Sequence, residues 1–162
     1  MFPLCATAAI ASPAADARSG LPSPCDPGED SVSAQPEAAA RPVRVAIADD
    51  SDDLCMMLAE LVDASPGLLC VARITTQGDL VSTVAQSKPD VLLLDLLFGG
   101  VSSLPLVPQL RAAHARTRIV IHSGFDIDPL ADRALDGGAV AVIPKGGDPD
   151  ELIAAIRRIA VQ

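Results

Sequence analysis

Residues 43–50 read VRVAIADD, a run of β-branched and small apolar residues that ends in two carboxylates. After Arg44 no polar residue alternates with the apolar ones, which is the pattern of a strand covered on both faces. Such strands are typical of parallel sheets that carry helices on each side. This stretch therefore predicts an α/β fold and places its first strand.

Four more apolar stretches follow, and a helical stretch comes after each of the five. Short alternating units imply right-handed crossovers, and so we predict a doubly wound, five-stranded parallel sheet. The other expected strands are 68–74, 91–96, 118–124 and 139–145, and the expected helices are 52–65, 78–87, 104–114, 128–138 and 148–161.

The first and third helical stretches carry the most specific local expectations. In the first, Leu54, Leu58 and Leu61 recur at helical spacing and predict the buried face. In the third, Pro105 falls in the first turn, where proline is tolerated, whereas Pro108 lies deeper and fits less well.

Residues 1–42 differ in composition from the rest of the chain. They hold seven of the fourteen prolines, and most of the remainder is Ala, Ser, Gly and acidic residues. Such a segment buries too little apolar surface to offset its ordering entropy. We therefore expect 1–42 to be a disordered extension and 43–162 to form the folded domain.

The overall charge and apolar pattern exclude several classes of protein. The net charge of −9 and the scattered basic residues argue against direct nucleic-acid binding. No run approaches 18 uninterrupted apolar residues, so no membrane span is expected. The four cysteines lack metal-ligand spacing, and Cys55 and Cys70 lie in apolar stretches typical of buried thiols. We expect a cytoplasmic protein.

Polar residues stand at the carboxyl ends of four expected strands: Asp49 and Asp50, then Asp95, Ser123 and Lys145. Ligands bind outside these ends in open α/β sheets, and so we expect the five side chains to meet. Three close carboxylates need a cation, for which Mg²⁺ is the first choice. A carboxylate nucleophile, a metal, a lysine and a hydroxyl together suit phosphoryl transfer.

Four motifs carry a resemblance to a known family: ADD at 48–50, VLLLDL at 91–96, IVIHSG at 119–124 and GAVAVIPK at 138–145. In this order they resemble receiver domains of bacterial two-component response regulators, over about residues 43–160. The resemblance implies a flavodoxin-like (βα)5 receiver fold. The closing KGGDPDELIAAIRRIA is similar to the branch that usually precedes a helix-turn-helix DNA-binding domain.

The same resemblance implies a role for each residue at the strand ends. Asp95 would be the phosphoacceptor, charged by a histidine kinase or a phosphotransfer protein. Asp49, Asp50, Asp95 and the backbone carbonyl of Leu97 would bind Mg²⁺. Ser123 and Lys145 would hold the phosphoryl oxygens.

The chain departs from the family pattern at several positions. Val142 stands where receivers usually carry an aromatic that swings inward, and Gly99 and Gly146 replace frequent prolines. We therefore expect no aromatic rotamer switch. Leu97 and Phe125 would flank the phosphorylated residue, and because both are apolar we expect slow autodephosphorylation.

The leading hypothesis is a stand-alone receiver, which is a phosphorylation-controlled binding module and not a metabolic enzyme. It would signal through a protein partner or a homodimer, and the resemblance implies that the signalling surface lies at about residues 127–160. Two alternatives stay open: a degenerate receiver that acts as a phosphorylation-independent scaffold, and a transcription regulator without its DNA-binding domain. An aspartyl-phosphate phosphatase would need an acid at position 97, where Leu97 stands.

Overall fold

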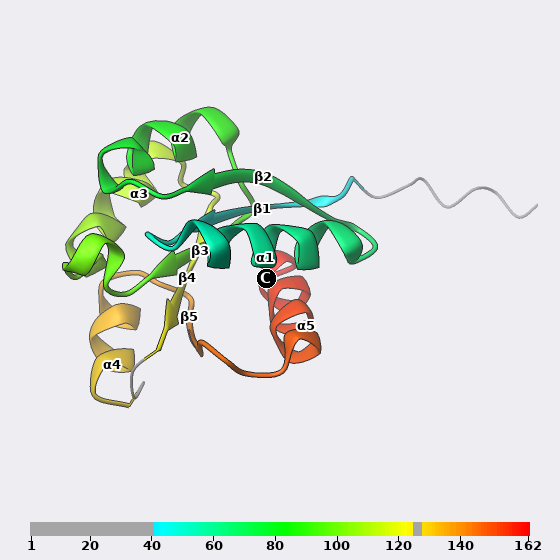
Figure 1. Ribbon diagram of the computed structural model, residues 1–162. Coiled ribbons are helices and arrows are strands. Elements are labelled where there is room, and N and C mark those ends of the chain that lie inside the picture. Colours follow the sequence, from blue (N-terminus) through cyan, green and yellow to red (C-terminus); the bar gives the residue numbers. More distant parts are fainter. Residues whose placement is uncertain (1–40, 125–127) are drawn as a thin grey trace, which may run out of the picture. The chain divides into compact units, whose positions relative to one another are not determined.

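The computed structural model describes residues 41–124 and 128–162. The expectations for residues 1–40 and for Phe125 lie outside the described residues. Five parallel strands form one sheet in the order β2-β1-β3-β4-β5, as Figure 1 shows, which confirms the predicted fold class. The strands are β1 (Val43–Ala48), β2 (Leu68–Ile74), β3 (Val91–Asp95), β4 (Arg118–Ser123) and β5 (Ala141–Pro144).

Helices cover both faces of the sheet, and the two-residue period of each strand explains why (Figure 1). In β1, Val45 and Ile47 pack against α1 and α5, whereas Ala46 and Ala48 pack toward α2, α3 and α4. No helix in the described part of the chain is long and apolar enough to cross a membrane. The helices are α1 (Asp52–Ala64), α2 (Leu80–Ser87), α3 (Val107–Ala113), α4 (Asp128–Asp136) and α5 (Pro149–Ala160).

Two helices differ in detail from the sequence-based expectation. The stretch 104–114 is divided into a 3-10 turn at Leu104–Leu106 and α3, which begins at Val107. Pro108 thus lies in the first turn of α3, where its missing N–H removes no helical hydrogen bond. In α1 the buried residues are Cys55, Leu58 and Val62, and the expected Leu54 and Leu61 lie half-buried at the margin of that face.

Candidate functional site

The carboxyl ends of β1 and β3 bring three acids together. Ala48 pairs with Leu94 across the two strands, so Asp49, which directly follows β1, lies beside Asp95, the last residue of β3. Ligand oxygens of Asp49, Asp50 and Asp95 all lie within 4.8 Å of one another. Asp49 and Asp95 are buried, and Asp50 is exposed. The structure therefore gathers the acids that the sequence analysis singled out.

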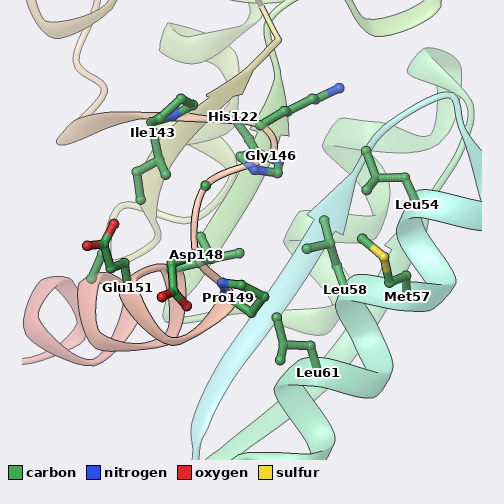
Figure 2. A pocket seen from close by; sticks show the side chains of 15 residues that line it. Leu54, Met57, Leu58, Leu61, His122, Ile143, Gly146, Asp148, Pro149 and Glu151 are labelled. Carbon is green, nitrogen blue, oxygen red and sulfur yellow. The ribbon is translucent and has the colours of Figure 1, made fainter.

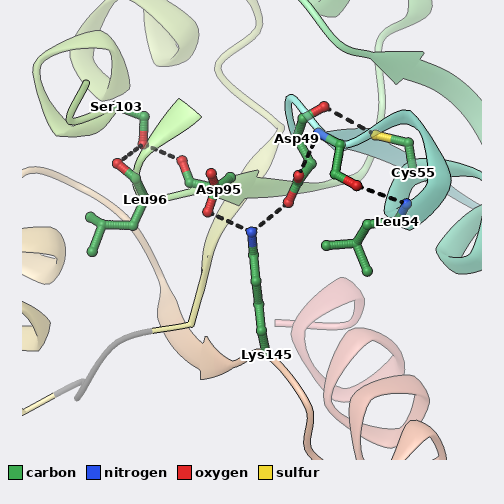
Figure 3. A network of polar contacts seen from close by, with 8 residues as sticks. Asp49, Leu54, Cys55, Asp95, Leu96, Ser103 and Lys145 are labelled. Carbon is green, nitrogen blue, oxygen red and sulfur yellow. Dashed lines mark hydrogen bonds and ion pairs between the residues drawn. The ribbon is translucent and has the colours of Figure 1, made fainter. Parts of the chain in front are cut away.

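Lys145 lies between two of these carboxylates, as Figure 3 shows. Its Nζ is 2.6 Å from Asp49 Oδ2 and 2.8 Å from Asp95 Oδ1. Burial alone would lower the pKa of Lys145, but the hydrogen bonds and negative charges of Asp49 and Asp95 outweigh it and raise that pKa. The ammonium group therefore stays charged and offsets the repulsion among the acids.

The start of α1 fixes the orientation of Asp49. Asp49 Oδ1 accepts a hydrogen bond from the Ser51 amide at 2.9 Å, and the Ser51 hydroxyl accepts from the Leu54 amide at 3.3 Å as the helix cap. The Cys55 thiol donates to the Asp49 carbonyl at 3.4 Å (Figure 3). Burial is the main cause that raises the pKa of the Cys55 thiol, which agrees with the expected structural role. Cys70, by contrast, is half-buried.

Ser123 and Lys145 are held side by side by the last two strands. Ser123 is buried at the end of β4, where it pairs with Pro144, and its carbonyl accepts from the Lys145 amide at 2.6 Å. The Leu97 carbonyl accepts from the Gly100 amide at 3.1 Å within the turn after β3. The metal-ligand role of Leu97 stays a prediction.

Ser103 is a residue of the site that the sequence analysis missed. It is fully buried, and its hydroxyl donates to the Asp95 carbonyl at 2.6 Å and lies 3.3 Å from the Leu96 carbonyl (Figure 3). Its amide also donates to the Leu96 carbonyl at 2.9 Å. Ser103 thereby ties the loop after β3 to the backbone of Asp95. No local pattern distinguishes Ser103 from the exposed Ser102 beside it.

Ser103→Ala is expected to lower the free energy of unfolding by about 1–3 kcal/mol, because two buried carbonyls lose their hydroxyl partner. Urea unfolding followed by circular dichroism measures the change. Ser102→Ala is the matched control, since this neighbour is exposed and is expected to change the free energy by less than about 0.5 kcal/mol. Equal effects of the two substitutions would contradict the anchoring role of Ser103.

His122 is a buried neutral base beside the site. It pairs with Asp95 across β3 and β4 and is 5% exposed. Burial is the main cause that lowers its pKa, and the positive charge of Lys145 lowers it further against the opposing effect of Asp49 and Asp95. As the pH falls below 6.5, His122 therefore takes up a proton more readily in the unfolded chain than in the folded one.

Stability is accordingly expected to fall as the pH drops below the usual histidine pKa of 6.5, through protonation of unfolded His122. The urea midpoint of wild type should decrease from pH 7.5 to pH 5.5 by more than that of His122→Asn. His114→Asn, at the chain's other histidine, serves as the control and should keep the wild-type decrease. Identical decreases in wild type and His122→Asn would refute this account.

The family model described as the response regulator receiver domain matches residues 45–157. The chain belongs to this family. It therefore carries the receiver module of two-component signal transduction, in which phosphorylation and Mg²⁺ are typical.

Relatives of this receiver include regulators and one class of enzyme. The nitrate/nitrite response regulator protein homolog of Haemophilus influenzae is 30% identical over 118 residues, which are 73% of this chain and 57% of the relative. A protein-glutamate methylesterase/protein-glutamine glutaminase of Myxococcus xanthus is 33% identical over 105 residues, which are 64% of this chain and 30% of the relative.

The solved structures agree with this assignment. A LuxR-family two-component response regulator from Aurantimonas sp. SI85-9A1 matches with a TM-score of 0.69 and 25% identity, covering 74% of this chain and 86% of that one. The receiver spans about half the length of the curated regulators that it matches.

Proposed function

We propose that this receiver accepts a phosphoryl group on Asp95 in a Mg²⁺-dependent reaction. The observation that carries the proposal is the position of the Lys145 ammonium between the carboxylates of Asp49 and Asp95, at 2.6 and 2.8 Å. Asp95 is thus a buried carboxylate with one cation already beside it and two further acids within 4.8 Å. A carboxylate held in this way can act as a nucleophile toward phosphorus.

The donor set fits a hard divalent cation. Asp49, Asp50 and Asp95 supply carboxylate oxygens within one ion's reach, and in our proposal the Leu97 carbonyl adds a fourth oxygen. Mg²⁺, when bound there, supplies positive charge that offsets the charge of the phosphoryl oxygens. One lysine cannot balance three carboxylates, and this deficit favours the binding of a cation.

The protein's own groups have separate tasks in the proposed transfer. An Asp95 carboxylate oxygen attacks phosphorus, forming an O–P bond while the P–N bond of a phosphohistidine or the P–O bond of acetyl phosphate breaks. Lys145 turns from Asp95 to a phosphoryl oxygen, and the Ser123 hydroxyl donates to another. An opposite charge at 4 Å is worth about 4 kcal/mol at an effective dielectric of 20. Lys145 should therefore contribute more than Ser123.

The phosphodonor that we propose is a histidine kinase or a phosphotransfer protein. A groove of about 280 Å³ runs between α1 and α5 and reaches Lys145. Figure 2 shows Leu54, Met57 and Leu61 of α1 facing Pro149 across it. Met57 is exposed, and this apolar surface beside the phosphoacceptor suits a partner protein that must bring its histidine to Asp95.

The readout proposed for this receiver is a change of surface on α4, β5 and α5. Leu135 of α4 is an exposed apolar residue there, available to a protein partner or a second copy. Val142 is half-buried and packs on the core beneath α4. Its side chain is too short for a change of rotamer to move a large group between the core and the surface. Phosphorylation would shift a two-state equilibrium by reorienting Ser123.

The position of Val142 also supports a second candidate, a receiver that binds its partner whether or not it is phosphorylated. Incubation with acetyl phosphate separates the two, with intact mass as the readout. The proposed function requires a gain of one phosphoryl group with MgCl₂ and none with EDTA. A chain that binds Mg²⁺ without any mass gain would favour the scaffold.

A further inference from the structure

The opposite edge of the sheet holds a second hollow, of about 700 Å³. Its walls come from the segments that precede β1, β3, β4 and β5, together with the ends of α3 and α5. Because all strands run parallel, the starts of the strands lie at the edge away from Asp95. The hollow is therefore separate from the phosphorylation site.

Four arginines line this hollow against a single acid: Arg41, Arg111, Arg116 and Arg118 against Asp90. A smaller hollow of about 270 Å³ shares part of this wall and adds Arg44 and Lys88. Such a concentration of positive charge runs against the net charge of −9. It surrounds a concavity and does not form the extended stripe typical of a nucleic-acid surface.

The one acid is already fully engaged. Asp90 receives two hydrogen bonds from the Arg41 guanidinium, at 2.8 and 3.2 Å, and one from the Arg44 amide at 2.9 Å. Burial alone would raise the pKa of Asp90, but the Arg44 amide and the Arg41 guanidinium outweigh it and lower that pKa. Asp90 therefore has little capacity left to neutralise the other arginines.

Arg111, Arg116 and Arg118 make no ion pair and no side-chain hydrogen bond with any residue in 41–124 or 128–162. Each guanidinium carries five donors in a planar fork that matches a phosphate or carboxylate group. Because all three guanidinium groups are positively charged and line one hollow, they repel each other in the free protein. A bound anion would relieve this repulsion and use the donors.

The backbone that presents these arginines is fixed. The Thr117 hydroxyl donates to the Pro89 carbonyl at 2.8 Å and the Thr117 amide to the His114 carbonyl at 3.0 Å, so Arg116 and Arg118 extend from a pinned turn. Arg111 lies over Gly138, where a Cβ would come within 2.7 Å of its Nη1. Gly138 has φ +102°, which other residues rarely adopt, so this backbone conformation requires glycine beneath Arg111.

We propose that this hollow binds a small molecule with two or more phosphate groups. Its volume lies within the range of about 300–1,000 Å³ typical of small-molecule sites. No aromatic side chain from residues 41–124 or 128–162 lines it, and so the base of a nucleotide would find no stacking partner of that kind among them. Recognition therefore rests on the arginine forks, and the matching ligand is a compact oligophosphate.

The test is isothermal titration of the full chain with inorganic tripolyphosphate, in EDTA and at fixed ionic strength. One site is expected, and Asp95→Asn should bind as wild type does because it alters only the other edge. Arg111→Gln/Arg116→Gln is expected to weaken binding about tenfold or more, through the loss of two charge-assisted contacts. The control Arg73→Gln/Arg158→Gln removes the same charge from exposed positions elsewhere and should weaken it less than about twofold.

Absence of binding by wild type, or equal weakening by the two double variants, would overturn the proposal. Citrate as tight as tripolyphosphate would overturn the assignment to phosphate. Amide chemical shifts of wild type give a test that needs no variant: tripolyphosphate should perturb residues 111, 116–118 and 138–140. Perturbations centred instead on Asp49 and Lys145 would also refute the site. None of these results depends on phosphorylation of Asp95.

Discussion

Asp95→Asn is expected to reduce phosphate incorporation from acetyl phosphate below detection, a loss of more than about 100-fold. The amide of asparagine has nearly the shape of the carboxylate but offers no nucleophilic oxygen anion. The substitution also removes one of the three acids that lie within 4.8 Å of one another, so Mg²⁺ should bind more weakly. Intact mass after incubation with acetyl phosphate and MgCl₂ measures phosphate incorporation. Calorimetric titration with MgCl₂ measures the affinity for Mg²⁺.

The matched control is Asp132→Asn, which makes the same chemical change at an exposed position on α4. This variant should take up phosphate at the wild-type rate. Uptake by Asp95→Asn equal to that of the control would sink the assignment of the phosphoacceptor. If neither wild type nor the control gains mass while both bind Mg²⁺, the scaffold becomes the better description.

Lys145→Gln is expected to destabilise the metal-free protein and to slow phosphorylation. Without the ammonium group, the buried carboxylates of Asp49 and Asp95 face each other and Asp50 with no internal cation. Breaking such a pair costs about 3–5 kcal/mol when it is fully buried, and we expect about 1–3 kcal/mol here because Lys145 reaches solvent. Urea unfolding in EDTA measures this loss.

Two further measurements distinguish charge balance from simple packing at Lys145. MgCl₂ should recover part of the lost stability, since a cation can replace the ammonium among the carboxylates, and Mg²⁺ should bind Lys145→Gln more tightly than wild type. The rate of phosphorylation by acetyl phosphate should nevertheless fall about tenfold or more, because Lys145 also serves the phosphoryl oxygens.

The control is Lys88→Gln, which alters the chain's only other lysine, exposed at the end of α2. It should leave the metal-free stability, the Mg²⁺ affinity and the rate of phosphorylation near their wild-type values. Lys145→Gln with unchanged metal-free stability and unchanged Mg²⁺ affinity would show that its ion pairs do not organise the site.

The strands could be predicted because burial on both faces leaves a recognisable apolar pattern in a sequence. Runs such as 91–96 have no polar alternation, and a residue that breaks such a run at its end is placed at the rim of the sheet. The acids and Lys145 stand at such positions. Helix details were harder, because Pro108 and the buried face of α1 depend on where the first turn begins.

Ser103 illustrates what no local pattern reveals. Its importance comes from full burial beneath the loop after β3 and from the carbonyl of Asp95 that it meets there. An adjacent serine of the same type is exposed. Only the path of the loop decides which of the two hydroxyls turns inward.

The sequence by itself determined the class of fold, the receiver family and the residues placed at the carboxyl ends of the strands. The tertiary structure alone decided that Lys145 bridges Asp49 and Asp95, and that arginines scattered along the chain surround one hollow at the other edge. The physical reason is that a parallel sheet sorts side chains by whether they precede or follow a strand. Distance along the chain then has little bearing on distance in space, and charges that are far apart in sequence meet at two opposite edges.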